Sequence, residues 1–165
     1  MEPLKQGMMQ LCVQQLKDKI SEGDTASILF NKDGWPYAYT VGNAINTKNR
    51  FELFTVGLIP PFIFAAHADI LEYLRNNEVV ISTSNQAHIL KDALPIPVAL
   101  VKAPESITEE AFPLSSAIHS ADACVPHYQL VLSDNKGRFP WDKECDNECR
   151  VMQSLFIDLD QVVVN

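Results

Sequence analysis

The chain has 165 residues, 47% of them apolar, and its 21 acidic and 13 basic side chains give a formal net charge of −8. This length is enough to bury a substantial core and predicts one domain over residues 1–165. The acidic balance and the absence of a Lys and Arg cluster argue against a nucleic acid as partner, because phosphate binding depends on such clusters.

Three features of the sequence bear on where the protein resides. The longest apolar stretch, residues 58–66, contains two prolines and is shorter than the roughly 20 residues that cross a bilayer. The N-terminal segment mixes glutamines with apolar positions, so it lacks the hydrophobic region of a secretory signal. Four unevenly spaced cysteines are too few for a disulfide scaffold and fit a reducing compartment. We therefore expect a cytosolic protein without membrane contact.

The N-terminal part of the chain predicts a helix and then a hairpin. The helix is expected over residues 3–22, at the periphery of the domain, with one apolar face against a sheet: Leu4, Met8, Leu11, Cys12, Leu16 and Ile20. Residues 25–30 and 37–41 are β-prone and flank a turn that contains Asp33 and Gly34, which is typical of a hairpin.

The rest of the chain predicts alternating strands and helices. A broad apolar stripe predicts a helix over residues 61–75, and short helices are expected within 107–123 and 143–153. Strands are expected at residues 51–56, 79–82, 97–102, 128–132 and 155–164. This order predicts an α+β fold, in which a mostly antiparallel sheet is packed by the N-terminal helix and the helix near 61–75.

The best site candidate follows the strand at 128–132. There the chain breaks into a turn and presents a planar cation, an aromatic face and a carboxylate within five positions: Arg138, Trp141 and Asp142. Such a group can recognise a polar ligand or lock a loop. Gly137 and Asp134 belong to the same turn and are included among the candidates.

Three segments of the sequence carry a family resemblance. They are residues 39–42 (Tyr-Thr-Val-Gly), residues 51–58 (Phe-Glu-Leu-Phe-Thr-Val-Gly-Leu) and residues 130–141, which end in Gly-Arg-Phe-Pro-Trp. Over residues 25–157 the chain resembles the bacterial family called domain of unknown function 4262. It departs from the family pattern at Asn43, Phe51 and Ser133, so the resemblance implies a divergent member. It implies a shared fold and no established activity. Tyr39, from the first segment, is a further binding candidate.

Two roles are open for Arg138. Its planar fork of donors can grip a carboxylate or phosphate beside Trp141. Alternatively, Arg138 pairs with Asp134 or Asp142, and the aromatic side chains plug the core beneath the loop. We favour this second, structural role. We also predict that Gly42, Gly57 and Gly137 converge at one end of the sheet as the floor of a shallow cleft.

A second candidate is a metal site. Cys124 and His127 form one pair of soft ligands, and Cys145 and Cys149 form another. Four such ligands suit tetrahedral zinc if the intervening segment folds back as a hairpin. The spacing of the second pair is wider than is common, so zinc is a minor alternative and we expect no other cofactor.

The sequence leaves three functions open. The leading hypothesis is a small cytosolic bacterial or phage protein that binds another protein through an acidic surface, as an accessory, inhibitor or immunity-like module. The alternative is a hydrolase or transferase that binds a polar or anionic metabolite at residues 137–141, with Asp142 or a nearby histidine as acid or base. The third is a zinc-stabilised module. Common catalytic motifs are absent from the sequence, which favours binding over catalysis.

Overall fold

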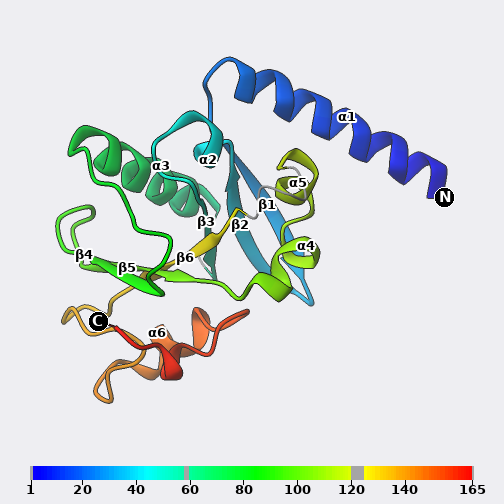
Figure 1. The fold of residues 1–165 in the computed structure, drawn as a ribbon. Coiled ribbons are helices and arrows are strands. Elements are labelled where there is room, and N and C mark those ends of the chain that lie inside the picture. The colour runs from blue at the N-terminus through cyan, green and yellow to red at the C-terminus, as the bar shows by residue number, and fades with distance from the viewer. Residues whose placement is uncertain (1, 58–59, 120–124, 165) are drawn as a thin grey trace.

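A six-stranded sheet in the order β1-β2-β3-β6-β5-β4 forms the centre of the protein (Figure 1). The computed structural model describes residues 2–57, 60–119 and 125–164. The strands are β1 (Ala26–Lys32), β2 (Trp35–Val41), β3 (Glu52–Val56), β4 (Ala87–Leu90), β5 (Val98–Lys102) and β6 (His127–Leu132). Neighbouring strands are antiparallel except for the parallel pair β3 and β6. The predicted α+β fold with a mostly antiparallel sheet is therefore confirmed.

The helices are short except for two. They are α1 (Glu2–Ser21), α2 (Asn43–Asn46), α3 (Pro60–Asn76), α4 (Thr108–Ala111), α5 (Pro113–Ile118) and α6 (Asn147–Met152), with 3-10 turns η1 (Glu105–Ile107) and η3 (Leu159–Gln161). None of the helices in the described part of the chain is long and apolar enough to cross a membrane.

Both faces of the sheet are buried, and successive side chains along each strand point to opposite faces. On one face, Leu53, Tyr128 and Leu100 pack with α3 side chains such as Ile70 and Leu74. On the other face lie Tyr37, Tyr39, Phe54 and Phe112 beside the C-terminal half of α1. The C-terminal segment covers β5 and β6 on this second face through Phe139, Leu159 and Val162.

The predicted hairpin is confirmed. Strands β1 and β2 pair antiparallel, with Lys32 opposite Trp35. Asp33 and Gly34 between them both have positive φ, 53° and 85°, as the tight hairpin turn requires. The side-chain oxygen of Asn31 also accepts a hydrogen bond from the Gly34 N–H at 3.0 Å.

The apolar residues of α1 do not lie on the single face that the sequence predicted. Only its C-terminal half packs on the body, where Leu16 and Ile20 are buried, while the N-terminal half extends beyond α5 (Figure 1). At about 100° per residue, Leu4, Met8 and Leu11 point about 130° away from Leu16 and Ile20. The helix therefore has two apolar faces, one buried and one exposed.

Two predicted strands are wrong. Residues 79–82 form no strand, because the Asn49 side chain takes the backbone groups that a neighbouring strand would use. Its amide donates to the Val79 carbonyl, and its oxygen accepts from the Ile81 N–H. Residues 155–164 also form no strand, since Leu159 and Val162 pack onto the face of the sheet instead of extending its edge.

The predicted convergence of glycines is also wrong. Strands β2 and β3 are antiparallel, so Gly42 after β2 and Gly57 after β3 lie at opposite ends of the sheet. Each glycine meets a close backbone neighbour there. A Cβ on Gly42 would lie 2.9 Å from the Asp24 carbonyl oxygen, and one on Gly57 would collide with the Met152 carbonyl.

Gly57→Ala is expected to destabilise the fold by about 2–4 kcal/mol, because φ is +81° and the added carbon meets the rigid Met152 backbone. Urea unfolding followed by circular dichroism measures this change. Gly7→Ala is the matched control, since nothing lies within 4 Å of that position in α1. It should leave stability unchanged or raise it by up to about 1 kcal/mol. Equal effects of the two substitutions would contradict the close approach at Gly57.

Candidate functional site

Arg138 is occupied within its own loop. Its Nε lies 2.8 Å from Asp134 Oδ2, and its terminal nitrogens lie 3.6 Å from Asp146 and 3.9 Å from Glu144. Only 24% of the Arg138 side chain is exposed. The guanidinium therefore faces three carboxylates of the same loop, which is the arrangement of the structural clamp that the sequence favours over the binding of an external anion.

Asp134 is the centre of this clamp. Its carboxylate accepts hydrogen bonds from the backbone N–H groups of Lys136, Arg138 and Asp146, in addition to the guanidinium. Burial alone would raise the pKa of Asp134, but these donors outweigh burial and lower it to about 2. Gly137, at φ 76°, makes the turn that brings the donors together.

The other loop candidates also have intramolecular roles. The Trp141 ring stacks on Phe139 with centroids 4.8 Å apart and an angle of 11°. The Asp142 carboxylate accepts from the Phe139 N–H at 2.8 Å. Tyr39 lies elsewhere, fully buried in the aromatic cluster around Phe112, and its hydroxyl accepts from the Leu114 N–H. The structure thus separates Tyr39 from the loop candidates.

The three candidate zinc ligands that lie within the described residues do not converge. Cys124 lies outside the described residues. His127 opens β6, whereas Cys149 contacts the Leu132 carbonyl at the other end of that strand, about 16 Å away for five strand steps. Burial raises the pKa of Cys145 to about 11 and also raises that of Cys149, which disfavours the thiolates that bind metal. No group of metal-binding side chains was found within the described residues.

The structure instead assembles a polar cluster around Glu52, which the sequence reasoning did not single out. Glu52 is fully buried at the start of β3. Its two oxygens accept from the Thr40 hydroxyl at 3.0 Å and from the backbone N–H groups of Gly42, Asn43 and Ala44 at 2.9–3.3 Å. His119 Nε2 lies 3.1 Å from Glu52 Oε2. One carboxyl group thus joins β2, α2, β3 and the residue that follows α5.

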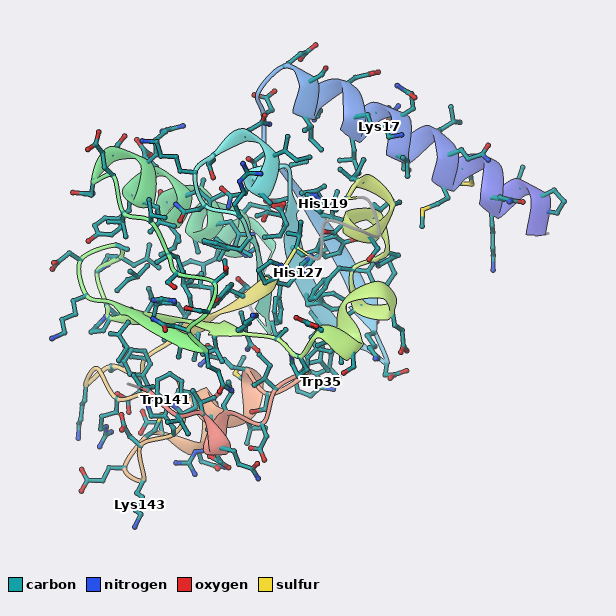
Figure 2. All side chains as sticks on the ribbon, viewed as in Figure 1. Lys17, Trp35, His119, His127, Trp141 and Lys143 are labelled. Atoms are coloured by element: carbon teal, nitrogen blue, oxygen red, sulfur yellow. The ribbon has the colours of Figure 1, made fainter. Side chains whose placement is uncertain are left out.

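A Ser–His pair lies beside this cluster. Ser115 Oγ is 2.8 Å from His127 Nε2, and the Phe112 ring stacks on the imidazole with centroids 4.3 Å apart. Figure 2 shows His119, which follows α5, near His127, the first residue of β6, with Trp141 in a different part of the molecule. Burial, followed by the nearby His119, lowers the pKa of His127 to about 3. Ser115 and His127 are 0% and 2% exposed, so a substrate does not reach this pair.

A second buried histidine lies on the α3 face. His67 Nε2 is 2.6 Å from Thr55 Oγ1, and the described residues offer its Nδ1 no hydrogen-bond partner. Burial lowers the pKa of His67 to about 4. His67 is therefore neutral at physiological pH and part of the core, and no carboxylate among the described residues pairs with it to make it a general base.

One sequence signal could have located the Glu52 cluster. Glu52 is the only charged residue in the apolar run 51–56, and a charge inside a buried strand needs several hydrogen-bond partners. Those partners come from residues 40–44 and from His119, which are distant in the sequence. The residue type could thus be flagged in advance, but its partners could not.

Asp134→Asn is expected to lower stability at pH 7, because a neutral amide replaces the carboxylate that four donors bind. The Asp134 pKa is lowered in the folded state from 3.8 to about 2. The stability that this carboxylate contributes is therefore present above pH 3.8 and is lost as the pH falls toward 2. Urea unfolding between pH 7 and 2 should show the wild-type advantage shrinking in that window. Asp92→Asn, at an exposed position, is the control, and equal loss in both variants would contradict the clamp.

His67→Gln is expected to flatten the acid dependence of stability, because glutamine can keep the Thr55 hydrogen bond without titrating. The pKa of His67 is lowered in the folded state from 6.5 to about 4. The stability that the neutral, buried His67 contributes is therefore fully present above pH 6.5 and is lost as the pH falls toward 4. Between pH 6.5 and 4, the free energy of unfolding of the variant should fall less steeply with decreasing pH than that of the wild type, by up to about 1.4 kcal/mol per pH unit. If the variant shows the same pH dependence of unfolding free energy as the wild type, His67 takes up a proton as readily in the folded protein as in the unfolded chain.

Comparison with known proteins supports the family resemblance. The family model described as Domain of unknown function (DUF4262) matches residues 19–146. This match includes the hairpin, the Glu52 cluster and the Arg138 clamp, and it begins after most of α1. No curated protein and no solved structure shows detectable similarity to the chain. Because the matched region covers more than half of the sequence, the chain belongs to the DUF4262 family.

Proposed function

We propose that this is a cytosolic protein-binding module, with an accessory, inhibitor or immunity-like role, that inserts the outer face of α1 into an apolar groove of a partner protein. The outer face consists of Leu4, Met8 and Leu11. These side chains are 71%, 62% and 67% exposed, and this exposure is the observation that carries the proposal. Soluble proteins usually cover a row of large apolar side chains with another surface.

The spacing of the outer face fits a known way of binding. Leu4, Met8 and Leu11 stand at positions i, i+4 and i+7, the anchor pattern of a helix that lies in a groove. Most of the packing of α1 on the body is made by its C-terminal half, so the outer face can enter a partner without unfolding the domain.

Charge favours a partner whose groove has basic surroundings. The chain carries a net charge of −8, which attracts a basic protein and accelerates its association. The outer face itself lies outside the family match at residues 19–146. Binding through it would thus be a property of the N-terminal helix of this chain.

A hydrolase or transferase has weaker support. The guanidinium of Arg138 is paired within its loop, and the Ser115 and His127 pair is closed to solvent. Within the described residues, neither group offers a substrate an exposed nucleophile or an open anion site.

The proposal is tested by comparing two double variants that carry the same added charge on α1. Leu4→Glu/Leu11→Glu places carboxylates on the outer face, and Gln6→Glu/Gln10→Glu places them on a different side of the same helix. A photo-crosslinker at position 8 should join a defined partner protein at a single site. We expect the first variant to lose at least about 90% of this crosslink, since two apolar anchors are worth more than about 1.4 kcal/mol.

The matched variant should keep the crosslink, and both should retain the wild-type circular dichroism spectrum. Equal crosslinking by both variants would contradict the role of the outer face. A crosslink only to a second copy of this chain would also contradict the proposal, and it would show as a mass that rises with protein concentration.

A further inference from the structure

A cleft opens between α2, the loop after it and the end of α3. It encloses about 320 Å³, within the range of small-molecule sites. Its apolar surface comes from Leu71, Leu74, Val79 and Val80, and its polar rim includes Lys48, Arg75 and Glu78. None of these residues belongs to the Arg138 loop or to the outer face of α1, and the cleft meets the Glu52 cluster at Asn43, which also lines it.

The two walls of the cleft are tied together by hydrogen bonds. Asn49, from the loop after α2, donates to the Val79 carbonyl at 3.0 Å and accepts from the Ile81 N–H at 2.8 Å. Asn43 donates to the carbonyls of Asn49 and Phe51 and thereby holds the loop onto α2. The cleft is therefore preformed, and a ligand would pay little to order it.

The charges at the rim select the ligand. Lys48 and Arg75 are exposed, and the ion pairs identified within the described residues include neither of them. Glu78 supplies one carboxylate against these two cations, so the rim carries an excess of one positive charge. In a protein of net charge −8, such an excess beside an apolar floor favours a single anionic group on an apolar body.

We propose that this cleft binds a small amphipathic carboxylate, with its apolar body on Leu71, Leu74 and Val79 and its carboxylate between Lys48 and Arg75. The guanidinium of Arg75 suits a carboxylate because its planar fork can donate two parallel hydrogen bonds. This site does not depend on the protein-binding role of α1, because the two surfaces share no residue.

The test is a titration of the full ¹⁵N-labelled chain with hexanoate, followed by amide chemical shifts. Saturable shifts are expected at residues 47–49 and 79–80. Hexanol, which has the same chain without the charge, should bind at least about tenfold more weakly. Lys48→Gln/Arg75→Gln should lose at least about tenfold in hexanoate affinity, and Glu78→Gln should gain affinity because a repelling carboxylate is removed.

The control is Lys91→Gln/Lys136→Gln, which removes two exposed cations outside the cleft and should bind hexanoate as the wild type does. Its ¹⁵N spectrum and that of the cleft variants should keep the wild-type dispersion, which shows that they are folded. The proposal would be overturned by no saturable shift at the cleft amides, by equal binding of hexanol, or by equal losses of hexanoate affinity in Lys48→Gln/Arg75→Gln and Lys91→Gln/Lys136→Gln. Shifts confined to residues 4–11 would overturn it as well, because they would report adsorption to α1.

Discussion

The hydrogen bonds of the buried Glu52 carboxyl group determine the arrangement of the chain where β2 ends and β3 begins. Moving a carboxyl group out of water is costly unless hydrogen bonds replace the lost hydration. Here the Thr40 hydroxyl, three backbone N–H groups at the start of α2 and the His119 ring supply them. The same contacts fix the path of the chain from β2 into α2, because those N–H groups must all point at one side chain.

The position of α2 in turn determines both surfaces that we assign to binding. Asn46 of α2 donates to the Ile20 and Asp24 carbonyls and so secures the C-terminal end of α1. Asn43 of α2 holds the loop that carries Lys48 and forms one wall of the cleft. A substitution at Glu52 would therefore perturb both the base of α1 and the cleft, although Glu52 itself contacts neither the outer face of α1 nor the floor of the cleft.

Sequence reasoning succeeded where the signal was local. The Asp33-Gly34 turn predicted the hairpin because few residues adopt two successive positive φ angles, and the apolar stripe at 61–75 predicted α3. It failed where a distant side chain decided the outcome. Residues 79–82 are β-prone, but the Asn49 side chain, 30 residues earlier, takes their backbone groups. The rim cations Lys48 and Arg75 were not flagged either, since nothing in the sequence places residue 48 beside residue 75.

The residues that carry the family resemblance explain the fold better than they explain binding. Glu52 and Asp134 are enclosed by intramolecular donors, Gly57 makes room for the Met152 carbonyl, and Trp141 covers Phe139. Each of these residues has its contact partners within the chain, so no ligand is needed to explain its place in the structure. Among the described residues outside those motifs, the apolar row on α1 is exposed, and the two cleft cations belong to none of the identified ion pairs. The motif residues therefore specify an architecture, and we propose that the recognition of partners and ligands falls to residues outside those motifs.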